Sequence, residues 1–175
     1  LLITAFLYFF SRSILNTYLP IYARLDLTLS DAEVASLATF RSLGIILIRF
    51  SSATFLTRIA QRPIFLLGII LGGIVSFLSP FINTYLSLCG VMFLSGLSYG
   101  AISILGNVFV ARTATAQNRG VATSLYNVAS STGNITKIVT TPLAESWGLL
   151  SVFVLGGISA FVALLPSIIR RYSPV

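Results

Sequence analysis

Six long apolar segments alternate with short polar links along this chain. The segments cover roughly residues 1–23, 34–56, 64–82, 85–111, 121–144 and 149–169. A helix of about 20 residues spans the hydrocarbon core of a bilayer, which is about 30 Å thick. The pattern therefore predicts an all-α integral membrane protein in which residues 1–175 form a single domain of six transmembrane helices. Too little chain remains outside the segments for a separate soluble catalytic domain.

Composition indicates the same environment. Hydrophobic residues make up 56% of the chain and charged residues 9%, whereas soluble domains carry about 25% charged residues. The expected partner is thus the lipid bilayer. The net charge of +7 comes from basic residues near the segment ends rather than from one soluble patch, so no nucleic-acid partner is predicted. With Cys89 as its single cysteine and no histidine, the chain offers no disulfide framework or metal cluster, and we expect no cofactor.

The links between the segments alternate in charge. The first link is acidic, the third is uncharged and the fifth carries Glu145. The second, the fourth and the tail are basic, through Arg58, Arg62, Arg112, Arg119, Arg170 and Arg171. The positive-inside rule places these basic parts in the cytoplasm, and an even number of crossings puts the other end there too. We therefore expect a multi-pass protein of the cell membrane. Because the chain opens inside an apolar run without an initiator methionine, we expect a fragment whose upstream part is missing.

Four cations fall at membrane depth, where a charge costs at least about 2.5–3.5 kcal/mol and normally faces a cavity or a partner. They are Arg12, Arg41, Arg49 and Lys137. Polar residues also recur every three or four positions, which places each set on one helix face. These stripes are Tyr8, Arg12 and Asn16; Tyr99, Ser103 and Asn107; and Ser124, Asn127, Ser131, Asn134, Lys137 and Thr141.

Two interpretations of the stripes stay open. They either line a water-filled path or join helices through hydrogen bonds, since hydrocarbon would leave them unpaired. The predicted cavity residues are Arg12, Asn16, Arg41, Asn107, Asn127, Asn134 and Lys137. All four acids of the chain lie near the outer ends, so either partners come from the missing part of the protein or the cavity attracts an anion. The spacings Gly68-xxx-Gly72 and Gly96-xxx-Gly100 predict close helix packing.

Two links of the chain carry recognisable motifs. Residues 49–63 read RFSSATFLTRIAQRP, which resembles the motif R-x-x-x-G-x-L-x-D-R-x-G-R-R that the major facilitator superfamily carries after the second helix of each half. Arg49, Arg58 and Arg62 match its basic positions, whereas Thr57 replaces its Asp and alanines replace its glycines. NRGVATSLYNVASSTGN and PLAESWG resemble the family's link from the fourth helix into the fifth and the approach to the last helix.

The resemblance covers essentially all of the chain and implies half of a twelve-helix transporter, built as two inverted three-helix repeats. A weak sequence similarity between residues 12–24 and 100–112 fits such repeats. We favour the C-terminal half, because the Asp is lost at Thr57, Lys137 and Ile138 stand where a first half carries Gly-Pro, and the chain ends soon after its last helix. By resemblance, Arg49, Arg58 and Arg62 form a cytoplasmic gate that stabilises one access state.

The leading hypothesis is a secondary active transporter that moves a small polar solute by alternating access. The basic lining favours an anionic substrate. The alternative is a membrane sensor or scaffold that keeps the fold without transport. An enzyme is not expected, because intramembrane catalysis needs a nucleophile–base pair or metal-binding carboxylates and histidines, and this chain has no histidine and no acid at membrane depth.

Overall fold

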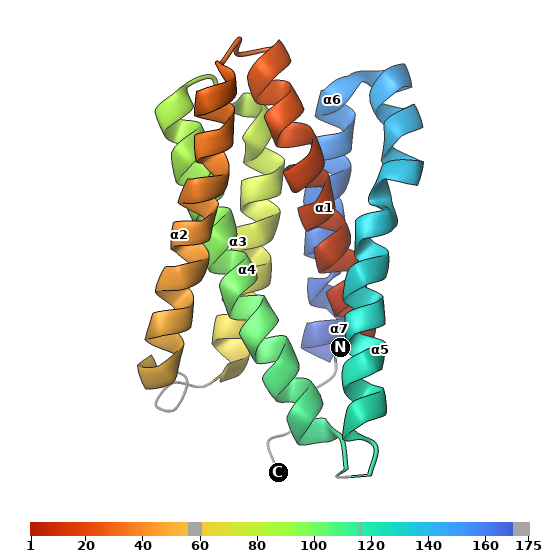
Figure 1. Ribbon diagram of the computed structural model, residues 1–175. Helices are drawn as coiled ribbons and strands as arrows, with labels where there is room; N and C mark the ends of the chain where they lie inside the picture. The colour runs from red at the N-terminus through yellow and green to blue at the C-terminus, as the bar shows by residue number, and fades with distance from the viewer. Residues whose placement is uncertain (56–60, 116, 170–175) are drawn as a thin grey trace.

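The computed structural model describes residues 1–55, 61–115 and 117–169, without the side chains of 52–55, 134, 136, 137, 168 and 169 (Figure 1). The elements are α1 (Leu2–Leu25), α2 (Asp31–Phe55), α3 (Gln61–Leu78), η1 (Ser79–Phe81), α4 (Tyr85–Thr113), α5 (Arg119–Thr132), η2 (Gly133–Ile135), α6 (Thr136–Val162) and α7 (Leu164–Ile169). The all-helical prediction is confirmed for this described part of the chain.

The elements group into six helical rods. Four of them are α1, α2, α3 and α4; the fifth runs from α5 through η2 to Trp147, and the sixth from Leu149 through α7. The last two rods are separated inside α6 by Gly148, whose φ of 80° lies in the left-handed region that glycine adopts without a steric penalty. Segment 121–144, predicted as one helix, is instead divided into α5, the 3₁₀ turn η2 and the start of α6.

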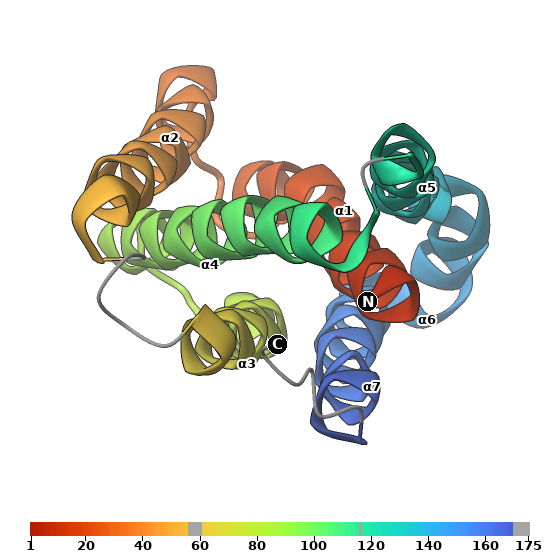
Figure 2. The same ribbon diagram turned by 90° about the horizontal axis from the view of Figure 1, so that it is seen from below.

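Viewed from below, the bundle has two sides. α1 and α4 lie in the middle, α2 and α5 flank them on one side, and α3, the later, darker blue part of α6 and α7 lie on the other (Figure 2). α4 packs against α2 and α3, whereas α1 packs against α5 and α6. We call the side between α2 and α5, with α1 and α4 behind it, the open face. The least buried helices border it: 11% of the span in α2 is buried, and Tyr126 is the buried residue of α5.

Two apolar clusters hold the bundle together. One includes Ile14, Leu19 and Phe153, and the other includes Ile69 and Leu105, all of which are fully buried. Large apolar side chains also cover the outside, among them Leu43, Leu47, Phe50, Leu67, Ile74, Phe77, Leu86 and Leu150. An apolar exterior of this kind suits lipid rather than water. Among the described residues, four segments are long and apolar enough to cross a membrane: Asp31–Ser51, Gln61–Phe81, Tyr85–Thr113 and Ile138–Ser167.

Glycines set how closely α2 and α4 approach. A Cβ at Gly96 would overlap the carbonyl oxygen of Arg41, and a Cβ at Gly44 would overlap that of Phe93. At Gly100, a Cβ would overlap the side chain of Ile48. Small residues permit such backbone contact between membrane helices, where dispersion replaces the hydrophobic effect as the main attraction. The contact matters for the site, because it fixes the turn of α2 that carries Arg41.

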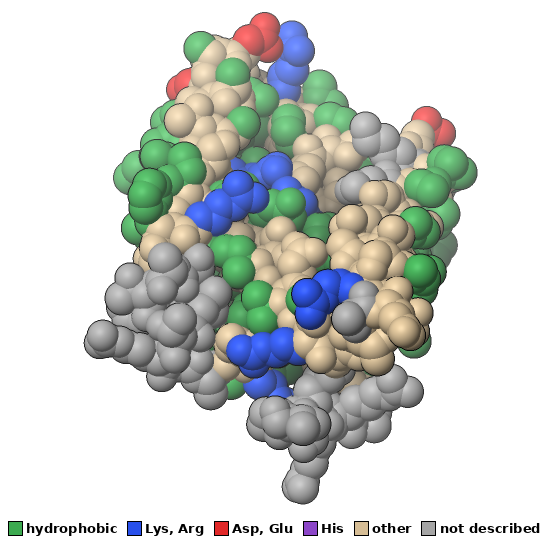
Figure 3. All heavy atoms as spheres, turned by 60° about the horizontal axis from the view of Figure 1, so that its bottom comes forward, with side chains coloured by type: hydrophobic (Ala, Val, Ile, Leu, Met, Phe, Trp, Pro, Cys, Tyr) green, Lys and Arg blue, Asp and Glu red, His purple; other side chains and the backbone are tan. Residues whose placement is uncertain are grey.

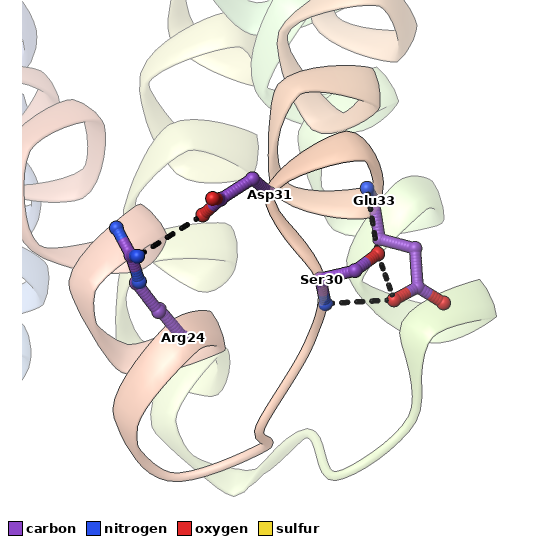
Figure 4. Close-up of polar contacts among 4 residues, drawn as sticks. All are labelled: Arg24, Ser30, Asp31 and Glu33. Atoms are coloured by element: carbon purple, nitrogen blue, oxygen red, sulfur yellow. Dashed lines mark hydrogen bonds and ion pairs between the residues drawn. The ribbon is translucent and has the colours of Figure 1, made fainter.

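The link from α1 to α2 is closed by polar contacts (Figure 4). The Glu33 carboxylate accepts hydrogen bonds from the Ser30 N–H at 2.9 Å and from the Ser30 hydroxyl at 2.7 Å, while Ser30 Oγ accepts from the Glu33 N–H at 3.4 Å. This is a capping box, which satisfies backbone donors at the start of α2. Arg24 and Asp31 form an exposed ion pair at 3.3 Å, a kind of contact that adds little stability. The acidic link is therefore an ordered helix start at the upper end of the bundle.

Candidate functional site

Arg41 and Asn16 join α2 to α1 on the open face. The Arg41 Nη1 atom donates a hydrogen bond of 2.5 Å to Asn16 Oδ1, and both side chains are half-buried. Asn16 stands one helical turn after Arg12, so α1 presents both residues on the same face. A single neutral amide orients the Arg41 guanidinium but leaves its charge uncompensated.

Arg12 rests on an aromatic ring of α4. Its Cζ atom lies 3.2 Å from the centroid of the Tyr99 ring, a cation–π contact that partly offsets the cost of a desolvated guanidinium. Phe9 packs edge-on against the same ring, with centroids 6.0 Å apart. Phe9 of α1 thus holds the Tyr99 ring in place, and this ring in turn supports the Arg12 guanidinium.

A chain of hydroxyl groups lies next to Arg12, toward the interior. Ser98 Oγ donates to the carbonyl of Gly68 on α3 at 2.7 Å, so the Tyr8 hydroxyl donates in turn to Ser98 Oγ, also at 2.7 Å. The two bonds connect α1, α4 and α3 at one level of the bundle. Tyr8 and Ser98 are both buried, and such a satisfied polar chain fixes how these three helices meet.

The open face concentrates positive charge at Arg12 and Arg41. Arg12 and Arg41 are close enough for their like charges to interact unfavourably. Neither has a carboxylate partner among the residues that the structure describes. Figure 3 shows Lys and Arg side chains over the middle and lower parts of this face, whereas the acidic side chains lie at the upper end, where another basic side chain stands beside them. Because Coulomb interactions strengthen as the dielectric falls, a group that neutralises both guanidiniums would bind here favourably.

The other predicted cavity residues lie farther along the helices that border this face. Asn127 is exposed on α5, as are Ser124 and Ser131 of the same stripe. Asn107 is exposed on α4, and its Nδ2 atom donates to the Ser103 carbonyl of its own helix at 2.7 Å. The side chains of Asn134 and Lys137 are outside the described part of the structure. The structure thus brings Arg12, Asn16 and Arg41 together, and the roles of all seven residues stay predictions.

Two of the three predicted gate residues, Arg49 and Arg62, lie toward the lower end. Arg62, at the start of α3, donates from Nη2 to the Ser167 carbonyl of α7 at 3.4 Å, so a cation binds a carbonyl in the last turn of another helix. Arg49 is exposed near the end of α2, and Arg58 lies outside the described residues. Their gating role stays a prediction.

Sequence reasoning missed several contributors. The sequence marks Tyr8 and Tyr99 only as members of polar stripes, and the predicted stripes do not include Ser98. The spacing Ser95, Ser98, Tyr99 along α4 could have revealed a polar face.

The comparisons with known proteins address the family directly. A family model described as Major Facilitator Superfamily matches residues 1–175, whereas a comparison with curated proteins gives no match. The match confirms the resemblance seen in the two links at the level of the family. Members of this family are multi-pass membrane transporters and typically not enzymes. The chain belongs to the Major Facilitator Superfamily of membrane transporters.

Proposed function

We propose that this chain is the C-terminal six-helix half of a twelve-helix secondary active transporter, which moves a small anionic solute by alternating access. The observation that carries the proposal is the pair Arg12 and Arg41 on the open face, held by Asn16 and Tyr99 without a carboxylate among the described residues. Two uncompensated guanidiniums at membrane depth are costly unless a ligand or a water-filled cavity meets them.

The substrate group that fits best is a carboxylate or a phosphate. A guanidinium presents a planar fork of donors that matches two oxygens of either group. Arg41 keeps donors beyond the one used by Asn16, and Arg12 is supported through its ring contact rather than by an acid. Asn107, Asn127, Asn134 and Lys137 would line the same cavity toward α4, α5 and α6.

The missing half would cover the open face. Without it, Arg12, Asn127 and the other polar residues there would meet lipid, which offers no hydrogen bonds. In this arrangement α1–α3 and α4–α6 form two inverted repeats, the chain crosses the cell membrane six times, and both ends lie in the cytoplasm. Rocking of the halves would expose the site alternately to each side, with Arg49, Arg58 and Arg62 stabilising one state at the cytoplasmic end.

Ligand-dependent stability of the full-length transporter tests the proposal. We expect at least one small carboxylate or phosphate compound to raise the Tm, whereas matched neutral and cationic compounds do not, because a ligand stabilises the state that it binds. Arg12→Gln and Arg41→Gln should each abolish that shift, and uptake of the same compound into proteoliposomes should fall with it.

Arg112→Gln is the matched control, since Arg112 is an exposed arginine at the end of α4. This variant should keep both the thermal shift and the uptake. A shift that survives both site variants would contradict an anion site at this pair. Failure of every compound in a diverse panel would instead favour a sensor or scaffold that keeps the fold.

A further inference from the structure

A small cavity lies directly beside Arg12, on the interior side of the open face. It has a volume of about 10 Å³ and is lined by residues of three helices: Tyr8, Ser11, Arg12 and Leu15 of α1, Gly72 and Ser76 of α3, and Ser95 of α4. Most of the lining is apolar, but three serines and one arginine contribute polar atoms to it. α3 borders this cavity although it lies on the far side of α1 and α4 from the open face (Figure 2).

Two polar atoms in this lining have no partner among the residues that the structure describes. The Nε atom of Arg12 and the Oγ atom of Ser76 are both buried and make no hydrogen bond. Ser76 is fully buried, with 0% of the residue exposed. The nearby Tyr8 hydroxyl donates its proton to Ser98 and forms no hydrogen bond with either atom. Buried polar atoms are rarely left unpaired in native structures, and an ordered water or ion commonly pairs those that lack a protein partner.

The volume and the polar lining atoms of the cavity determine which molecule or ion can occupy it. A single water needs about 10–15 Å³ of such space and two to four polar partners. A water can accept a hydrogen bond from the Arg12 Nε–H and form another with a serine hydroxyl. A cation would be repelled by the guanidinium. A halide is larger than water and would crowd the cavity walls.

We propose that this cavity holds one ordered water that bridges Arg12 Nε and Ser76 Oγ, with the hydroxyls of Ser11 and Ser95 as its neighbours. The water joins α1, α3 and α4 just beside the Tyr8–Ser98–Gly68 chain. Arg12 is then held on two sides, by the Tyr99 ring and by the water. The inference goes beyond the proposed transport function, because it depends on the ligand-free protein alone.

The sign of the stability change in Ser76→Ala tests the water site in the full-length protein without substrate. If the water is present, the variant removes one of its partners, and we expect the Tm to fall by about 1–3 °C. If the cavity is dry, the variant removes an unpaired buried hydroxyl, and the Tm rises. A rise would therefore overturn the proposal.

Ser159→Ala is the matched control. Ser159 is also a buried serine, but its hydroxyl donates to the Gly156 carbonyl of its own helix at 2.8 Å, so its loss should change the Tm by less than the loss of the Ser76 hydroxyl. An equal or larger fall in the control would mean that Ser76 has no special partner, against the proposal.

Two further measurements address the occupant itself. Replacing chloride by gluconate in the buffer should leave the wild-type Tm unchanged; a chloride-dependent rise that Ser76→Ala removes would overturn the assignment to water. A high-resolution experimental map should show one density peak within hydrogen-bond distance of both Arg12 Nε and Ser76 Oγ. An empty cavity in such a map would also overturn the proposal.

Discussion

At the level of single residues, the site is a set of contacts between side chains from different helices. The sequence could identify Arg12 and Arg41, because a charge inside an apolar segment is conspicuous whatever it touches. It could not identify Asn16 as the acceptor for Arg41 or Tyr99 as the support of Arg12, since those pairings depend on how the helices rotate and pack. Periodicity gives the face of one helix but not the neighbour that meets it.

The Tyr8–Ser98 hydrogen bond should show energetic coupling. Tyr8→Phe leaves Ser98 bonded to Gly68 but removes its donor, whereas Ser98→Ala leaves the buried Tyr8 hydroxyl unpaired. We expect each variant to destabilise the full-length protein, with the serine variant worse because an unpaired buried hydroxyl costs about 1–3 kcal/mol. The double variant should lose less unfolding free energy than the two single variants lose together, by about 0.6–1.7 kcal/mol.

Thermal or denaturant unfolding of the four proteins gives this coupling energy. The Ser42→Ala variant is a useful reference, because Ser42 is exposed and its hydroxyl donates to the Ala38 carbonyl of its own helix at 2.9 Å. The losses of unfolding free energy caused by Ser42→Ala and Tyr8→Phe should add up in the variant that combines them. Additive losses for Tyr8 and Ser98 themselves would mean that the bond between them contributes nothing measurable.

At the level of helices, apolar length predicts where rods occur, but local breaks follow from tertiary contact. The sequence predicts one continuous helix over 121–144, whereas the structure has the 3₁₀ turn η2 at Gly133–Ile135. A Cβ at Gly133 would lie 2.8 Å from the backbone nitrogen of Phe10, so α1 is in close contact with this turn. No pattern within segment 121–144 contains that information. The break at Gly148 was easier to anticipate, because glycine before an apolar run commonly marks a helix boundary.

The contact between α2 and α4 should be intolerant of added side-chain volume at Gly96. In Gly96→Ala the new Cβ would overlap the Arg41 carbonyl, which belongs to backbone and cannot rotate away. We expect a loss of about 1–3 kcal/mol, as for overpacked cores, measured by unfolding of the full-length protein. Because the same turn of α2 carries Arg41, the anion-dependent rise in Tm should shrink as well.

Gly90 provides the control on the same helix. A Cβ there would meet nothing within 4 Å, so Gly90→Ala should be neutral or slightly stabilising through its better helix propensity. Equal destabilisation by the two variants would show that glycine is required for helix flexibility and not for the approach of α2.

At the level of the whole molecule, charge is separated along the bundle axis. Asp26, Asp31 and Glu33 lie at one end, whereas Arg112 and Arg119 lie at the turn between α4 and α5 at the other (Figures 1 and 3). This separation was visible in the sequence, because link charge needs no knowledge of helix packing. The arrangement of the open face was not, since it depends on which helices become neighbours.

The orientation that this separation predicts can be measured with single cysteines in the full-length protein, made otherwise cysteine-free through Cys89→Ala and equivalent changes. Ala32, at the acidic end, and Gln117, at the basic end, are both exposed. Because basic links stay in the cytoplasm, an impermeant maleimide should label Ala32→Cys in intact cells and Gln117→Cys only after permeabilisation. The reverse pattern would place the basic end outside, and Arg49, Arg58 and Arg62 could then not form a cytoplasmic gate.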